Sequence, residues 1–348
     1  MSKVRFLFLI WALIGGLLAT MTFAVMVGSV DLTPSLIWEV LLQKLGFVSE
    51  AEAAASKPQS VIIWEIRFPR IILAAIVGAA LSISGAAIQA LVKNSIADPY
   101  ILGVSSGASV GATSVILLGA FGALGVYALS FAAFLGAILS VSIVFFLARV
   151  NGRTSVIRLL LAGIAVSMVL SAITNFILMM SKQQGGIQAV MHWMLGSLAG
   201  AKWSNLGIPF FTLLLVFILL FSHYRQLNAL LLGEETAATL GISLDGFRIF
   251  IILFVSLLTG VVVAVSGSIG FVGLIVPHIV RMMVGSNYKL VLPVSALIGA
   301  IFLVWADLVA RTVISPEEMP IGIITAICGS PFFIWMLRRR RYSFGDGE

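Results

Sequence analysis

Residues of the types that perform chemistry are few in this chain, and the densest group of them is acidic. Only 14 of the 348 residues are Asp or Glu, yet Glu234, Glu235 and Asp245 lie within 12 positions. Acidic side chains near a helix start are favoured by the helix dipole, and Gly241 can end a short helix in the left-handed conformation. The stretch therefore predicts a short, water-facing helix.

A serine nucleophile is the second candidate for chemistry. The run GVSSG, which begins at Gly103, matches the G-x-S-x-G elbow of hydrolases, but that elbow needs a preceding strand and a nearby His and acid. Here the run begins a predicted membrane-spanning helix, and Gly103, Gly107 and Gly111 recur every four residues, as in tightly packed helices. We interpret the run as a packing face and predict no catalytic residue. An intramembrane enzyme that uses one of the two serines is the alternative.

Metal, cofactor and nucleotide sites are not predicted. His192, His223 and His278 have no ligand spacing, and the single cysteine, Cys328, excludes a disulfide or a cysteine metal centre within one chain. No lysine follows a glycine, so the chain lacks the G-x-x-x-x-G-K-[ST] loop that cradles the phosphates of ATP. If this protein pumps a substrate, the energy must come from a partner.

The elements that must position these residues are membrane-spanning helices. Apolar residues make up 60% of the chain, charged residues make up 10%, and the mean hydropathy is +1.14, whereas soluble domains carry about 25% charged residues. A spanning helix needs about 20 apolar residues. We predict an all-α polytopic membrane protein, a single domain over 1–348, with about ten transmembrane helices. The predicted spans are 6–28, 66–92, 101–120, 125–149, 157–180, 207–223, 247–266, 270–285, 290–311 and 320–338.

The basic residues predict the orientation of the chain. With the N-terminus in the cytoplasm, 14 of the 21 Lys and Arg residues lie inside, which fits the positive-inside rule and places both termini in the cytoplasm. The net charge of +7 is therefore interpreted as a topology signal and not as affinity for nucleic acid. Asp307 is almost the only acid in the predicted spans, and this scarcity disfavours a proton-coupled carrier.

Weaker signals lie within and between the spans. GAALSISG at 78–85 resembles GVVVAVSG at 260–267, and the two copies run in opposite directions, as the inverted repeats of transporters do. Pro34 is placed to open a short helix in the outer loop 31–60, to which we assign no role. Residues 187–200 predict a partial helix that is too short to span.

Five stretches together resemble one family of membrane permeases. They are RFPR (67–70), SGAAIQALVKNSIADPYILGVSSGASVG (84–111), LLLGEETAATLGIS (230–243), SGSIGFVGLIVPHIVR (266–281) and ADLVARTVISPEEMPIGIITAICGSPFF (306–333). They resemble the permease subunits of ATP-binding-cassette (ABC) importers for iron–siderophores, haem and cobalamin, the FecCD-type family. The resemblance covers nearly the whole chain and implies a multi-pass permease in the bacterial inner or plasma membrane.

The resemblance implies that the acidic stretch couples the permease to an ATPase. In this family the cytoplasmic loop between helices six and seven, here 231–244, docks into a groove on the ATPase subunit. Thr236 stands in this loop where many importers have alanine. The implied coupling residues are Gly233, Glu234, Glu235, Thr236, Ala237 and Gly241.

The resemblance also implies a docking site and a gate. Arg67, Arg70 and Arg311 fall at outer helix ends, where arginines of similar permeases receive acidic residues of a soluble binding protein, a task that suits the guanidinium fork. Snorkelling or anchoring to lipid headgroups is the alternative. The implied cytoplasmic gate comprises Asn94, Ser95 and Ile96, where relatives often have Asn-Pro-Leu, together with Ser155, Val156 and Ile157.

The predicted assembly is a homodimer in the lipid bilayer with two ABC ATPase subunits and an extracytoplasmic substrate-binding protein. ATP-driven alternating access moves an iron chelate (siderophore), haem or cobalamin along the two-fold axis, past residues 161–180 and 187–200. An iron chelate or haem is favoured because those uses are the more numerous in the family. The alternative is an ion-gradient-driven secondary carrier of a similar substrate.

Overall fold

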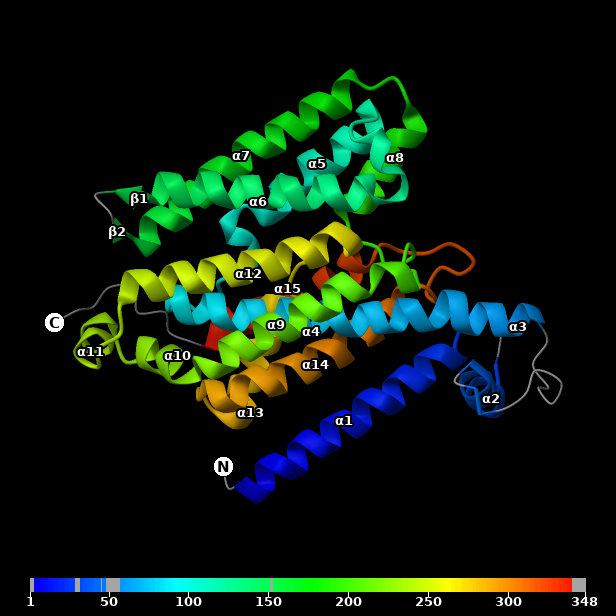
Figure 1. The fold of residues 1–348 in the computed structure, drawn as a ribbon, viewed down its shortest axis with the longest axis horizontal. Coiled ribbons are helices and arrows are strands. Elements are labelled where there is room, and N and C mark those ends of the chain that lie inside the picture. The colour runs from blue at the N-terminus through cyan, green and yellow to red at the C-terminus, as the bar shows by residue number, and fades with distance from the viewer. Residues whose placement is uncertain (1–2, 29–31, 45, 48–56, 151–152, 340–348) are drawn as a thin grey trace.

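The computed structural model describes residues 3–28, 32–44, 46–47, 57–150 and 153–339. It is an elongated bundle whose long helices lie roughly along one axis (Figure 1). The helices, with π and 3-10 segments marked η, are α1 (Lys3–Met26), α2 (Pro34–Lys44), α3 (Lys57–Val61), η1 (Ile62–Arg67), α4 (Phe68–Val92), η2 (Pro99–Leu102), α5 (Val104–Leu118), η3 (Gly122–Tyr127), α6 (Ala128–Ala148), α7 (Val156–Met180), α8 (Gln184–Met194), η4 (Trp203–Asn205), α9 (Gly207–Ser222), α10 (Tyr224–Leu231), α11 (Glu234–Thr239), α12 (Leu244–Ser266), α13 (Val272–Val284), α14 (Tyr288–Ala310) and α15 (Ile321–Arg339). Strands β1 (Arg149–Val150) and β2 (Arg153–Thr154) pair antiparallel.

Apolar helices occupy all ten of the predicted spans. Seven of them, alone or with the short helix that precedes them, are long and apolar enough to cross a membrane: α1, α4, α6, α7, α9, α12 and α14. α5, α13 and α15 are apolar but shorter. The predicted fold class, an all-helical polytopic membrane protein, is confirmed. The two-residue strands β1 and β2 were not among the predicted elements.

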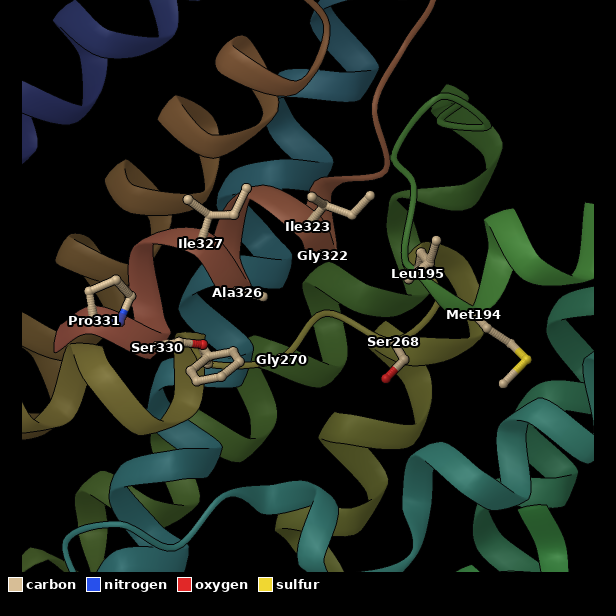
Figure 2. A pocket seen from close by; sticks show the side chains of 11 residues that line it. Met194, Leu195, Ser268, Gly270, Gly322, Ile323, Ala326, Ile327, Ser330 and Pro331 are labelled. Carbon is tan, nitrogen blue, oxygen red and sulfur yellow. The ribbon is translucent and has the colours of Figure 1, made fainter. Parts of the chain in front are cut away.

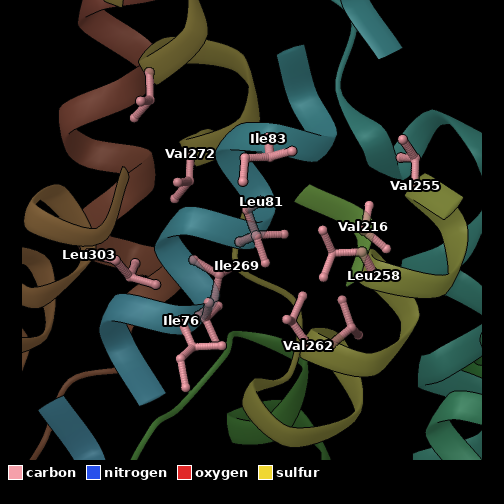
Figure 3. Close-up of a cluster of buried hydrophobic side chains, with 14 of the residues drawn as sticks. Ile76, Leu81, Ile83, Val216, Val255, Leu258, Val262, Ile269, Val272 and Leu303 are labelled. Atoms are coloured by element: carbon pink, nitrogen blue, oxygen red, sulfur yellow. The ribbon is translucent and has the colours of Figure 1, made fainter. Parts of the chain in front are cut away.

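α4 is the central helix of the bundle. Nearly every residue from Pro69 to Leu91 is buried, as expected for a helix that is apolar on all sides. It packs on α12, α13 and α14. Figure 3 shows the resulting core, in which Leu81 and Ile83 of α4 lie among side chains such as Val216 of α9 and Val262 of α12.

Small residues allow the central helices to touch backbone to backbone. A Cβ on Gly78 would lie 2.1 Å from the carbonyl oxygen of Gly299 in α14, and a Cβ on Gly85 would lie 1.9 Å from that of Gly273 in α13. No side chain fits at such distances, so glycine is required at both crossings. This tight core fixes the position of α4 relative to the helices that carry the candidate sites.

A second group of helices comprises α5, α6 and α7, which pack on one another beside the central group (Figure 1). A Cβ on Gly107 would lie 2.2 Å from the carbonyl oxygen of Gly136, and one on Gly111 would lie 2.0 Å from that of Ala132. The interpretation of the glycines in α5 as a packing face is therefore confirmed. Ser105 Oγ lies 2.7 Å from Ser268 Oγ, a contact between the two helix groups.

The two copies of the faint repeat occupy equivalent places. Residues 78–85 lie in α4 and residues 260–267 end α12, and α4 and α12 run in opposite directions. Each helix is followed by a short linker and a short apolar helix, α5 or α13. The linkers meet, because the Tyr100 hydroxyl donates to the carbonyl of Ile269 at 3.0 Å and accepts from its N–H at 3.1 Å. This arrangement supports the inverted-repeat hypothesis.

Two predicted helix boundaries are wrong. The second span was expected to begin at residue 66, but helical structure extends back to Lys57 through the π segment η1. The partial helix expected at 187–200 lies earlier, at Gln184–Met194. The short helix expected at Pro34 is present as α2; residues 48–56 of the same outer loop lie outside the described residues.

Candidate functional site

The acidic stretch forms a short helix set between two glycines in unusual conformations. α11 is preceded by Gly233, at φ +114°, and followed by Gly241, at φ +80°, both of which favour glycine. The Gly241 N–H donates to Ala238 O at 2.9 Å and the Ile242 N–H donates to Ala237 O at 3.2 Å, which closes the helix end. The predicted short helix and its glycine stop are confirmed.

One side of α11 is anchored and the other faces water. Ala237 is fully buried, whereas Glu235 and Thr236 are exposed. The neighbouring helix α10 buries Leu227 and Leu230. The Asn228 side chain links α10 to the start of α14, because its Nδ2 donates to Asn287 Oδ1 at 3.0 Å and its Oδ1 accepts from the Tyr288 N–H at 2.8 Å. α11 is therefore connected to the central helix α14 through α10.

The three outer arginines lie close to the opposite end of the bundle, but they do not project freely. The Arg67 guanidinium donates to the carbonyls of Val25 and Met26, at the end of α1, and Arg311 donates to that of Ala24. Cations at a helix C-terminus are favoured by the dipole and satisfy its orphan carbonyls. Arg67 and Arg311 thus fasten the end of α1 to the bundle.

Arg70 belongs to a buried ion network. Its Nε lies 2.9 and 3.1 Å from the two carboxylate oxygens of Asp307, and its Nη1 lies 2.8 and 2.9 Å from those of Glu318. Arg311 Nε approaches Asp307 at 3.7 Å. The sequence predicts Arg70 at an outer helix end, but Glu318 was not among the predicted site residues. The available signal was the acidic pair in the run SPEEMP, near the outer end of the same predicted hairpin.

The predicted gate residues lie in two turns. In the first, Asn94 Oδ1 accepts the Ile96 N–H at 3.1 Å, directly after the α4 cap Lys93, which has φ +54°. In the second, Ser155 precedes α7, its carbonyl accepts the Leu159 N–H, and the side chain of Ile157 is exposed. The described contacts do not place the two turns against each other, and the gating role stays a prediction.

Asp98 follows the first gate turn and acts as a cap. Its Oδ1 accepts the Tyr100 N–H at 2.9 Å at the start of η2. Burial raises the pKa of the Asp98 carboxyl to about 6, although this hydrogen bond acts in the opposite direction. The residue therefore serves the turn that joins α4 to α5.

An open cavity of about 610 Å³ lies between the end of α8, the linker 268–271 and α15 (Figure 2). Its walls include Met194, Leu195, Ser268 and Ile323, and no charged residue lines it. A second open cavity, of about 510 Å³, follows α7 past Ser167, Met168, Ser171 and Asn175, again without a charged residue. Residues of the two ranges expected to line a path, 161–180 and 187–200, form part of these cavity walls, and α15 forms a wall that the sequence did not indicate. The role of either cavity in transport stays a prediction.

Metal-binding clusters are absent from the described residues. No group of three or more His, Cys, Asp or Glu side chains is placed to hold an ion in that part of the chain. His278 lies in α13 with its ring edge-on to Phe332, at 5.9 Å between ring centroids. The described residues thus provide two uncharged cavity walls, a short helix with exposed side chains, and a charge network near one end of the bundle.

Comparison with known proteins identifies the family. A model of the FecCD transport family matches residues 16–339. The chain is 42% identical over 296 residues to the cobalamin import system permease protein BtuC of Halobacterium salinarum, which covers 85% of this chain and 78% of that protein. It is 41% identical over 282 residues to the hemin transport system permease protein HmuU of Yersinia pestis, with coverage of 80% and 84%.

Two further relatives extend the comparison. The Fe(3+)-citrate import system permease protein YfmD of Bacillus subtilis is 41% identical over 286 residues, which covers 81% of this chain and 83% of that protein. A solved structure described as an inward-facing metal-chelate type ABC transporter superposes with a TM-score of 0.83 at 31% identity, over 95% of this chain and 99% of that one. The chain therefore belongs to the FecCD transport family and is a multi-pass membrane permease, the transport subunit of an ABC import system.

Proposed function

We propose that this permease works as a homodimer with two ABC ATPase subunits and an extracytoplasmic binding protein, and that it imports a bulky metal chelate. The relatives are named for cobalamin, hemin and ferric citrate, and these three chelates are the candidate substrates. ATP-driven alternating access is the proposed mechanism. The observation that carries the proposal is α11, a helix with exposed side chains at Glu235 and Thr236 whose buried Ala237 ties it to the bundle.

The coupling role assigned to 231–244 is supported by the contacts that hold this loop. The loop is held by the glycine conformations at Gly233 and Gly241, and α10 connects it to α14 through Asn228. A docked ATPase that moves α11 therefore moves the bundle instead of bending a loop. Glu235 and Thr236 are among the side chains that a partner can contact, since both are exposed.

The orientation of the proposed permease follows from its two ends. The start of α1 lies at the same end of the bundle as α11, β1 and β2, whereas α2 and α3 lie at the other end (Figure 1). An ATPase is cytoplasmic, so the α11 end is placed inside and the end that carries Arg70 and Glu318 is placed outside. This orientation agrees with the excess of basic residues on the proposed inner side.

A pathway between two copies of the chain is supported by the open cavities. Both are bounded on one side by α7, α8 or α15 and are open on the other. Large apolar side chains such as Leu161, Met168 and Ile327 remain exposed on α7 and α15. A second copy that faces these helices turns two open cavities into one enclosed, uncharged path, which suits a large chelate that must pass without tight binding.

Co-purification and transport assays test the proposal. Permease isolated from native membranes in mild detergent is expected to carry an ATPase at one copy per permease, identified by mass spectrometry. In proteoliposomes, uptake of labelled haemin, cobalamin or ferric citrate is expected to require ATP and to survive a protonophore. Uptake that needs a proton or sodium gradient and ignores ATP would make the secondary carrier the correct function.

A further inference from the structure

The Arg70 guanidinium forms ion pairs with two carboxylates whose side chains differ widely in solvent exposure. Its Nε and Nη2 face Asp307, with Nη2 at 2.9 Å from Oδ1, and its Nη1 faces Glu318 at 2.8 Å. The side chain of Asp307 is 1% exposed and that of Glu318 is 39% exposed. Of these two edges of Arg70, the one that Glu318 occupies therefore lies nearer to solvent.

The two carboxylates are not held equally. Asp307 lies within α14 and is approached by both Arg70 and Arg311, so its departure would remove a counter-charge from two largely buried cations. Glu318 lies in the turn between α14 and α15, where water competes for the ion pair and makes it weak. Glu318 is thus the carboxylate of the network that another carboxylate can replace.

The turn that carries Glu318 leads directly into the wall of the larger cavity. Two residues separate it from α15, whose Gly322 and Ile323 line that cavity. The Ile321 N–H donates to Gly196 O at 3.1 Å and the Gly322 N–H donates to Leu195 O at 3.0 Å. These two bonds join α15 to the segment after α8 at one edge of the cavity, three to four residues from the Arg70–Glu318 pair.

We propose that Glu318 is a latch that an acidic docking partner displaces. A carboxylate on the partner's surface takes the Nη1 edge of Arg70, and the freed turn lets the start of α15 separate from Leu195 and Gly196. The exchange replaces one carboxylate by another, so no buried charge is left unpaired. The inference rests on the proposed docking of a binding protein at this end, and it names how docking is signalled to the pathway.

The latch is tested first without any partner. Cys328 is the only cysteine, so Cys328→Ala provides a background in which Ile323→Cys reports on the cavity wall. In nanodiscs, Glu318→Gln is expected to speed alkylation of that cysteine by a water-soluble maleimide about two- to fivefold, the range that an exposed ion pair is worth. The matched control is Glu317→Gln, an exposed neighbour in the same turn, which is expected to keep the parental rate.

Equal rates for Glu318→Gln, Glu317→Gln and the parent would overturn the latch. Glu318→Asp keeps the charge but shortens the side chain, and it is expected to give an intermediate alkylation rate. It replaces Glu318→Gln in the test if that variant does not fold. Docking is measured separately, with the binding protein recovered alongside the permease. Glu318→Gln is expected to bind it several-fold more tightly than Glu317→Gln does. Absence of binding to the parent would refute the docking site while the alkylation result still decides the latch.

Discussion

Gly85 of α4 and Gly273 of α13 bring two helices into backbone contact, although 188 positions separate them in the sequence. A Cβ on Gly85 would lie 1.9 Å from the carbonyl oxygen of Gly273 and 2.6 Å from its Cα. Gln89, one turn further along α4, strengthens the crossing, because its Nε2 donates to Gly273 O at 3.1 Å. The crossing joins the central helix to one of the two short helices that follow the repeat linkers.

The first prediction follows from that contact. Gly85→Ala is expected to destabilise the folded permease by about 3 kcal/mol or more, because the clash is with backbone that cannot rotate away. Thermal unfolding in detergent, followed by fluorescence-detected size exclusion, measures the effect. Gly15→Ala in α1 is the control, since nothing lies within 4 Å of the added methyl. Equal melting temperatures for the two variants would refute the requirement for glycine at the crossing.

The second prediction concerns Asp307. Asp307→Asn is expected to cost about 3–5 kcal/mol of unfolding free energy, because it leaves the buried Arg70 without its main counter-charge. Glu318→Gln removes the more exposed partner of the same guanidinium and is expected to cost about 1 kcal/mol or less. Denaturation of both variants under one condition tests the contrast. Similar losses for both would show that the two carboxylates are held alike.

The third prediction is a pH dependence at Asp98. Because the pKa of this carboxyl is raised from 3.8 to about 6 in the folded chain, the folded state binds more protons than the unfolded state between those values. Stability is therefore expected to fall as pH rises through that window. Asp98→Asn keeps a capping oxygen for the Tyr100 N–H. It is expected to raise the melting temperature above pH 6 and to flatten the profile between pH 4 and 6; an unchanged profile would remove Asp98 as its source.

Much of the fold could be predicted from the sequence because the bilayer restricts the composition of the helices that span it. Each spanning helix needs a long apolar run, and these runs are separated by glycine, proline and charged residues, so ten elements could be placed. Boundaries were harder to predict. Helical structure before residue 66 continues through Trp64 and Glu65 in a π segment, which no periodic pattern announces. The strands β1 and β2 flank an Asn-Gly pair, a hairpin signal that is readable in the sequence.

The candidate sites were predictable to different degrees. The coupling stretch is local, so its acids and glycines sufficed to predict a short helix and its end. The network of Arg70 is not local: Asp307 lies 237 positions away and Glu318 lies 248 positions away. An arginine at an outer helix end was therefore expected to bind acidic residues of a partner or lipid headgroups, whereas the fold supplies Arg70 with carboxylates of the same chain. The cavity wall on α15 depends in the same way on a tertiary contact, between Gly322 and Leu195.

The last prediction tests α11 as the coupling element. Glu235→Lys is expected to lower ATP-driven uptake at least about tenfold, because like or mispaired charges across a docked interface cost several kcal/mol. Insertion and melting temperature are expected to stay unchanged, since Glu235 is exposed. Thr239→Lys places the same side chain at the exposed C-terminal end of α11, where a cation suits the helix dipole, and it is expected to retain most uptake. Full uptake by Glu235→Lys would remove the coupling role from this helix, and equal losses in both variants would show that bulk at the interface matters more than the Glu235 carboxylate.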